Sequence, residues 1–191
     1  TWSEGGIWRT ENIGSLKSGA IRTIAFEEIS GLISTESMPF LSLSATRLAP
    51  KSVVLPELGV AKTNIPAWRS TLGLSSALSS TSYQGEIDPF PITGSLLTFG
   101  PFIQFGHKVE NYLILLNLEK SPIARISEVD IFDSNKNVLK GTFEVRSNDV
   151  TIIKLDDLGF NPTDLPLIIC RSMVFIPLYF SKTSDGLSLS L

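Results

Sequence analysis

The chain has 191 residues, of which 42% are hydrophobic and 18% are charged. This composition, with a mean hydropathy of +0.20, excludes a disordered chain, a collagen and a long coiled coil. Sixteen Lys and Arg residues against nineteen Asp and Glu residues give a net charge of −3, and no basic block occurs. We therefore expect no nucleic-acid partner.

Cysteine and histidine are scarce in this sequence. Cys170 and His107 are the sole residues of their kinds, which excludes an intrachain disulfide and a zinc site built from Cys and His. The sequence predicts no metal and no cofactor.

We expect both ends of the chain to be cut. It begins at Thr1 without a methionine and ends inside the alternating run 187–191. No cationic stretch followed by an apolar core opens the chain, so no signal peptide is predicted. The longest apolar run, residues 165–180, contains two prolines and an arginine and is shorter than the ~20 residues that a membrane helix needs. We expect a soluble protein without a membrane span, in a compartment that the sequence does not indicate.

The first 82 residues have an irregular hydrophobic pattern. Residues 18–33 fit both a helical face and a strand, and we favour the strand. Alternation of apolar and polar residues and a β-branched pair predict two further strands, over residues 38–48 and 51–55.

A change in composition follows. Asn64, with a proline two residues later, predicts a short helix that continues through Leu78. Residues 75–82 are rich in Ser and Thr and are the best candidate for a linker. We expect one domain over residues 1–191, with a soft boundary near 75–82 between a less regular part and a strand-rich part, 83–191.

The strand-rich part has a hydrophobic period of two, which is typical of strands. Residues 167–176 are apolar on both faces, which predicts a central strand buried on both sides. The polar run 133–137 predicts a hairpin turn. The other predicted strands cover residues 96–105 with an interruption at Gly100-Pro101, 112–118, 126–132, 138–145 and 150–155.

About seven short strands joined by turns favour an all-β fold, a two-sheet β-sandwich of jelly-roll or immunoglobulin-like type, with at most one or two short helices. The Cys, Trp and Cys signature of immunoglobulin domains is absent from the sequence. The immunoglobulin-like label is therefore architectural.

Three residues are candidates for catalysis. Glu86 and Asp88 project to the same side if their segment is extended, and a pair of carboxylates can divide acid and base roles in glycoside hydrolysis. His107 stands at a turn between strands, but the sequence has no Gly-x-Ser-x-Gly motif to accompany it. A solvated strand end and an exposed turn residue are the plainer interpretations.

Asp133 and Glu144 have the spacing of the first and last ligands of a calcium loop. The sixth position, where such a loop needs glycine, is Val138, and the flanking segments are strands. We interpret the segment as a hairpin turn and expect no specific calcium binding.

Arg171 interrupts an apolar strand, so its guanidinium requires a partner. An ion pair with Glu128 or Asp130 is the plainer interpretation, and an anchor for an anionic ligand is the functional one. Aromatic rings in irregular segments stack on sugar faces in many binding sites, although they also fill cores. The aromatic candidates for binding are Trp2, Trp8, Trp68, Tyr83 and Phe90.

Three functions stay open at this point. The first is a non-enzymatic module that binds a carbohydrate or another small molecule, or that serves in protein assembly. The second is a hydrolase that acts on glycans through Glu86 and Asp88. The third is a self-associating subunit, because residues 187–191 predict an edge strand that needs a cover. Edge protection favours a homo-oligomer over a monomer.

Overall fold

The computed structural model describes residues 1–17, 19–31, 70–85, 90–100, 103–184 and 186–190. The chain forms two compact units. Unit 1 comprises Thr1–Trp68 with Ser121–Ala124, and unit 2 comprises Arg69–Lys120 with Arg125–Leu191. The predicted boundary at residues 75–82 lies inside unit 2, in the hairpin described below.

Unit 1 begins with a short antiparallel hairpin of β1 (Trp2–Glu4) and β2 (Ile7–Arg9). Its turn is the pair Gly5-Gly6, whose φ angles of 54° and 78° are readily adopted by glycine. The hydroxyl of Ser3 donates a hydrogen bond to the carbonyl of Pro122, which joins the hairpin to the second segment of the unit.

The described residues of unit 1 also contain one helix, α1 (Phe26–Ser30). The carboxylate of Glu28 accepts a hydrogen bond from the backbone N–H of Ala25, at 3.1 Å, and so caps the first turn. The strand favoured for residues 18–33 is therefore wrong: residues 26–30 are helical, because acidic residues in the first turn stabilise a helix start, and the described residues beside them form no strand.

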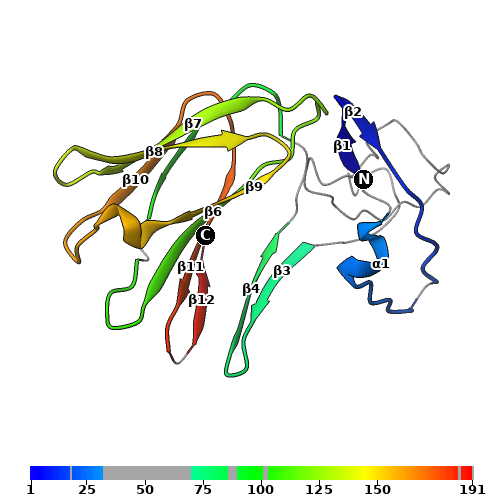
Figure 1. Cartoon of the computed structure of the whole chain (residues 1–191), viewed down its shortest axis with the longest axis horizontal. Helices are drawn as coiled ribbons and strands as arrows, with labels where there is room; N and C mark the ends of the chain where they lie inside the picture. Colours follow the sequence, from blue (N-terminus) through cyan, green and yellow to red (C-terminus); the bar gives the residue numbers. More distant parts are fainter. Residues whose placement is uncertain (18, 32–69, 86–89, 101–102, 185, 191) are drawn as a thin grey trace. The chain divides into compact units, whose positions relative to one another are not determined.

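Unit 2 contains two four-stranded antiparallel sheets, with the strand orders β5-β10-β7-β8 and β12-β11-β6-β9, and the separate hairpin β3-β4 (Figure 1). The strands are β3 (Ser70–Ser75), β4 (Ser80–Gly85), β5 (Leu96–Phe99), β6 (Glu110–Leu116), β7 (Ile126–Asp133), β8 (Val138–Arg146), β9 (Val150–Lys154), β10 (Pro166–Cys170), β11 (Ile176–Lys182) and β12 (Leu187–Ser190), and a 3-10 turn, η1, covers Leu155–Leu158.

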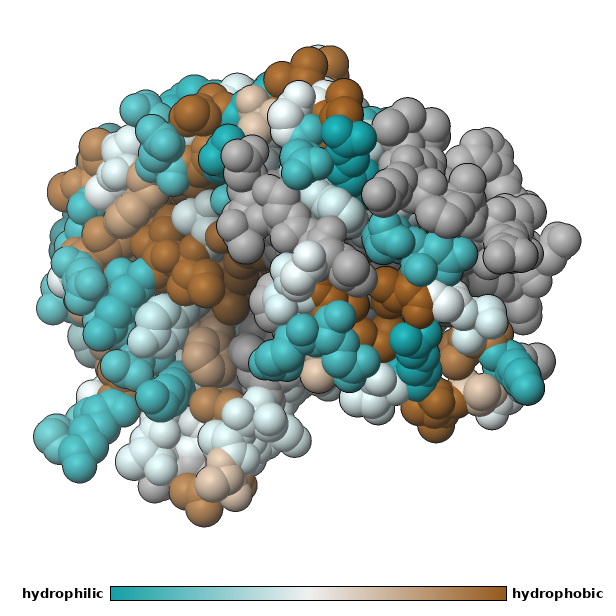
Figure 2. Space-filling view, turned by 45° about the vertical axis from the view of Figure 1, so that its right-hand side comes forward, coloured by the Kyte–Doolittle hydropathy of each residue, from teal (hydrophilic) through white to brown (hydrophobic). Residues whose placement is uncertain are grey.

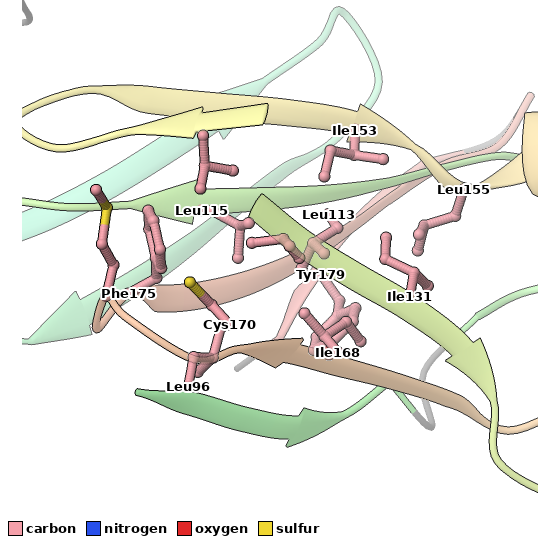
Figure 3. Packing of buried hydrophobic residues seen from close by; sticks show 13 residues of the cluster. Leu96, Leu113, Leu115, Ile131, Ile153, Leu155, Ile168, Cys170, Phe175 and Tyr179 are labelled. Carbon is pink, nitrogen blue, oxygen red and sulfur yellow. The ribbon is translucent and has the colours of Figure 1, made fainter. Parts of the chain in front are cut away.

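Both four-stranded sheets contribute side chains to one core. Figure 3 shows these side chains filling the space between the ribbons of the two sheets. The buried cluster consists of Leu96, Leu113, Leu115, Val129, Ile131, Val145, Ile153, Leu155, Ile168, Cys170, Met173, Phe175 and Tyr179.

The described residues thus confirm the all-β class, with α1 and η1 as their short helices. Two antiparallel sheets that share a core are consistent with a sandwich-like fold. Among the described residues, no helix is long and apolar enough to cross a membrane.

The central strand predicted over residues 167–176 is wrong in its length. The chain forms β10, leaves the sheet after Cys170, and enters the other sheet at β11. The connection passes Met173 and Phe175 through the core, where they are 1% and 3% exposed. Met173 and Phe175 are apolar because the chain crosses between the sheets at this point.

The remaining strand predictions divide by region. The strands that correspond to β5, β6, β7, β8 and β9 and the hairpin turn are confirmed. The second half of the run 96–105 is wrong, because the described residues 103–105 form no strand. The helix from Asn64 through Leu78 is wrong over 70–75, which is strand β3. The strands expected at 38–48 and 51–55 lie outside the described residues. The run 187–191 supplies β12, at an edge of its sheet.

Candidate binding face

The candidate catalytic residues do not form a described site. Glu86 and Asp88 lie outside the described residues. His107 is exposed in the turn between β5 and β6. The hydrolase therefore stays a prediction of the sequence.

The candidate aromatic residues are in different environments. Trp2 and Trp8 are 7% and 4% exposed, so their rings do not offer a surface for stacking. Phe90 is half-buried, and its backbone N–H donates to the carbonyl of Leu118 at 2.6 Å. Tyr83 belongs to β4, but its side chain and the whole of Trp68 lie outside the described part of the chain.

Arg171 follows the last residue of β10 and is exposed. Its Nη1 donates a hydrogen bond to the carboxylate of Asp130 on β7, at 2.6 Å. The predicted ion pair is thus present, with Asp130 as the partner. Hydrogen bonds from Arg171 and Thr142 hold the pKa of Asp130 below its ordinary value, because both stabilise the charged carboxylate.

The calcium-like spacing belongs to the β7-β8 hairpin. The side chain of Asp133 is buried, and its Oδ1 accepts hydrogen bonds from the backbone N–H groups of Asn135 and Leu165, at 3.1 and 3.3 Å. Glu144 lies on β8 opposite Glu128. Asp133 therefore organises the turn, and no group of three His, Cys, Asp or Glu residues in the described ranges is placed to hold a metal ion.

A network of charges fixes the loop after η1 to the same hairpin. The ammonium of Lys136 donates to the buried carboxylate of Asp164, and that of Lys140 lies 3.6 Å from the same carboxylate. The hydrogen bond from Lys136, aided by one from the N–H of Asn161, lowers the pKa of Asp164. These charges satisfy one another, so we assign them a structural role.

A second buried carboxylate lies after the end of β6. Glu119 is fully buried, and its two oxygens accept hydrogen bonds from Nε and Nη2 of Arg125, at 3.0 and 2.5 Å. The hydrogen bond to Glu119 raises the pKa of Arg125. The guanidinium of Arg125 also reaches the carbonyl of Ser172, at 3.3 Å. The pair therefore ties three segments of unit 2 together.

The most distinctive exposed feature of unit 2 is apolar. The registers place Phe99, Leu167, Phe132 and Leu139 side by side across the four strands of the β5-β10-β7-β8 sheet. These residues alternate along their strands with core residues such as Ile168 and Ile131, so they point away from the core. Leu97 and Ile169 extend the apolar area by a second row on the same side. We call this surface the outer apolar face: Leu97, Phe99, Phe132, Leu139, Leu167 and Ile169.

The outer apolar face is open to solvent. Leu97, Leu139 and Phe99 are 66%, 50% and 46% exposed, and Leu167 and Ile169 are half-buried by their neighbours. A row of large apolar side chains across a whole sheet is uncommon on a free surface.

In the other four-stranded sheet, β12-β11-β6-β9, apolar side chains that point away from the core are less exposed. Ile114 and Leu178 pair with each other, and both alternate with core residues. They are nevertheless 9% and 0% exposed. Ile152, which pairs with Ile114 and lies on the edge strand β9, is the one strongly exposed residue among these three described side chains, at 63%.

Figure 2, which shows one side of the molecule, has apolar areas bordered by polar side chains.

The sequence did not reveal the outer apolar face, although its residues were within predicted strands. The apolar pattern of residues 167–169 indicates burial on both sides, whereas one side faces solvent. The signal that could reveal the face is the register, which aligns the β7-β8 hairpin with β10 and β5, two strands that are distant from it in the chain.

No family model matches the chain, and searches of the curated proteins and of the solved structures also find no match.

Proposed function

We propose that the chain is a non-enzymatic binding module whose contact surface is the outer apolar face. The observation that carries the proposal is the row of Phe99, Leu167, Phe132 and Leu139 across the whole sheet. Burial of apolar area is the main driving force of protein association, and this area is already displayed without any rearrangement.

The chemistry of the face favours a protein surface as its partner. Its members are mainly aliphatic, and aliphatic side chains pack against the apolar residues of another protein. A sugar platform would present mainly flat rings, whereas four of the six side chains of the face are aliphatic and the rings of Trp2 and Trp8 are buried. A role in assembly is therefore better supported than carbohydrate binding.

Site-specific photocrosslinking in the cells that make the protein tests the proposal. The photoreactive residue p-benzoylphenylalanine replaces Leu97 in one variant and Ile152 in the other, because these two aliphatic residues are similarly exposed on different sheets, at 66% and 63%. We expect a defined crosslinked product from position 97 and none from position 152. Equal yields at both positions, or no product at position 97, would reject the outer apolar face as the contact surface.

A further inference from the structure

We propose that the outer apolar face binds a second copy of this chain, so that two copies pack face to face about a two-fold axis. This inference rests on the proposed function, since it names the partner of the same surface. In such a contact the same patch serves on both sides, so it must be compatible with itself in charge, shape and size.

The charges that border the outer apolar face satisfy this condition. Asp130 is neutralised by Arg171 within the same copy. Beyond this pair, exposed Glu128, Glu144 and Arg146 project to the same side of the sheet. Each copy thus offers both signs of charge near the apolar rows, and a two-fold rotation can bring Arg146 of one copy near a glutamate of the other.

The edge strands of this sheet are poorly suited to pair with a strand of another copy, so we expect association through the face of the sheet. Strand β8 has a register shift between Ile131 and Phe132 of its partner strand, and an extra residue of this kind disrupts edge pairing. Lys140, the extra residue, lies beside the carbonyl of Gly159 and the Asp164 carboxylate. The opposite edge strand, β5, has four residues. Neither edge is a long, regular template for another strand.

The size of the face suits a weak, reversible dimer. The four strands have 4, 5, 8 and 9 residues, so at ~3.3 Å per residue and ~4.8 Å between strands they cover roughly 400 Å². Two copies would bury roughly 800 Å², which is below the size of most stable interfaces and in the range of weak, transient contacts. We therefore expect association at about 1 to 1,000 µM rather than a permanent dimer.

Light scattering of the purified 191-residue chain across this concentration range tests the inference. We expect the mass to rise from 20.8 kDa toward twice that value. Leu97→Lys should raise the concentration at half-association more than about tenfold, because a buried ammonium would be uncompensated. Ile152→Lys, at a similarly exposed site on the other sheet, should change it by less than about twofold.

Leu139→Lys provides a second variant, on the other edge strand of the face. Circular dichroism shows which variants are folded. The association measured for a variant at position 97 or 139 is compared with that of the wild type only if the variant keeps the wild-type spectrum. A mass that stays at 20.8 kDa at every concentration overturns the inference. The inference is also overturned if Ile152→Lys weakens the association as much as the folded variant at position 97 or 139 does. If the mass stays monomeric while position 97 crosslinks to a different macromolecule, the second copy is rejected and the proposed function stands.

Discussion

Unit 2 contains two Arg–carboxylate pairs that differ in the burial of the acid and the base. The side chain of Glu119 is fully buried and that of Arg125 is 33% exposed, whereas Arg171 is 70% exposed beside Asp130. Removal of Arg125 leaves the buried carboxylate of Glu119 without a compensating charge. Removal of Arg171 leaves the carboxylate of Asp130, which is more hydrated.

We expect Arg125→Met to lower the free energy of unfolding by about 3 kcal/mol, the lower part of the range for a broken buried pair, because Arg125 is partly exposed. Arg171→Met is the matched control and should cost less than about 1 kcal/mol. Urea unfolding of both variants measures the difference. Equal losses would show that Glu119 is hydrated in solution, contrary to its burial in the structure.

Tyr179 links stability to alkaline pH. Burial raises its pKa to about 12 from an ordinary value near 10, although its hydrogen bond with Thr98 opposes the shift. A group with a raised pKa in the folded state contributes stability that is complete below the pKa of the unfolded state. This contribution is lost as the pH rises through the folded-state pKa.

We expect the wild-type free energy of unfolding to fall by about 2 kcal/mol more than that of Tyr179→Phe between pH 10 and pH 12, since two pKa units correspond to about 3 kcal/mol in all and part of this lies outside that range. Tyr112→Phe, at a half-buried tyrosine, is the control and should follow the wild type. Denaturant unfolding at a series of pH values provides the comparison. Parallel curves for wild type and Tyr179→Phe would contradict the burial of this hydroxyl.

At the scale of elements, the connection between β10 and β11 contributes to the core without being a strand. Phe175→Ala should lower the free energy of unfolding by about 3 to 5 kcal/mol, because it removes a buried ring and leaves a cavity. Phe99→Ala, at a ring that is 46% exposed, should cost markedly less in the monomer. Thermal or urea unfolding in dilute solution measures both. Similar costs would show that the connection lies outside the core.

The sequence predicted most of the strands in unit 2 because strands with one buried face have a period of two. In β7, for example, Val129 and Ile131 are buried while Glu128 and Asp130 alternate with them. The turn at 133–137 was also predictable, since Asp133 accepts a backbone hydrogen bond from within it. Local chemistry determines these features.

Features that depend on distant parts of the chain were not predictable. The connection between β10 and β11 resembles a strand in its apolar composition. What distinguishes it from a strand is the position of the second sheet, which the sequence does not give. Trp2 and Trp8 are buried although the hydrophobic pattern of their segment is irregular. The sequence predicted Glu128 or Asp130 as the partner of Arg171. The folded structure pairs Arg171 with Asp130, although the β10-β7 register aligns Asp130 with Ile169.

At the scale of the whole molecule, the sequence favoured self-association through an exposed edge at residues 187–191. The structure does place β12 at the edge of its sheet, and the backbone N–H of Leu187 donates to the hydroxyl of Ser79, at 2.9 Å. This contact brings part of the β3-β4 hairpin to the start of β12. We therefore propose the outer apolar face of the other sheet, rather than this edge, as the surface for assembly.

The most direct test of this surface is the solvent accessibility of a spin label on it. Cys170 is fully buried, so a nitroxide can be attached selectively to Leu97→Cys or, as a control, to Ile152→Cys. We predict that the collision rate of the label at position 97 with a water-soluble nickel complex falls as the protein concentration rises from about 1 to 1,000 µM, the range expected for a small interface, while that at position 152 stays constant. Constant accessibility at position 97, or an equal fall at both positions, would contradict the assignment of the outer apolar face as the surface through which the chain associates.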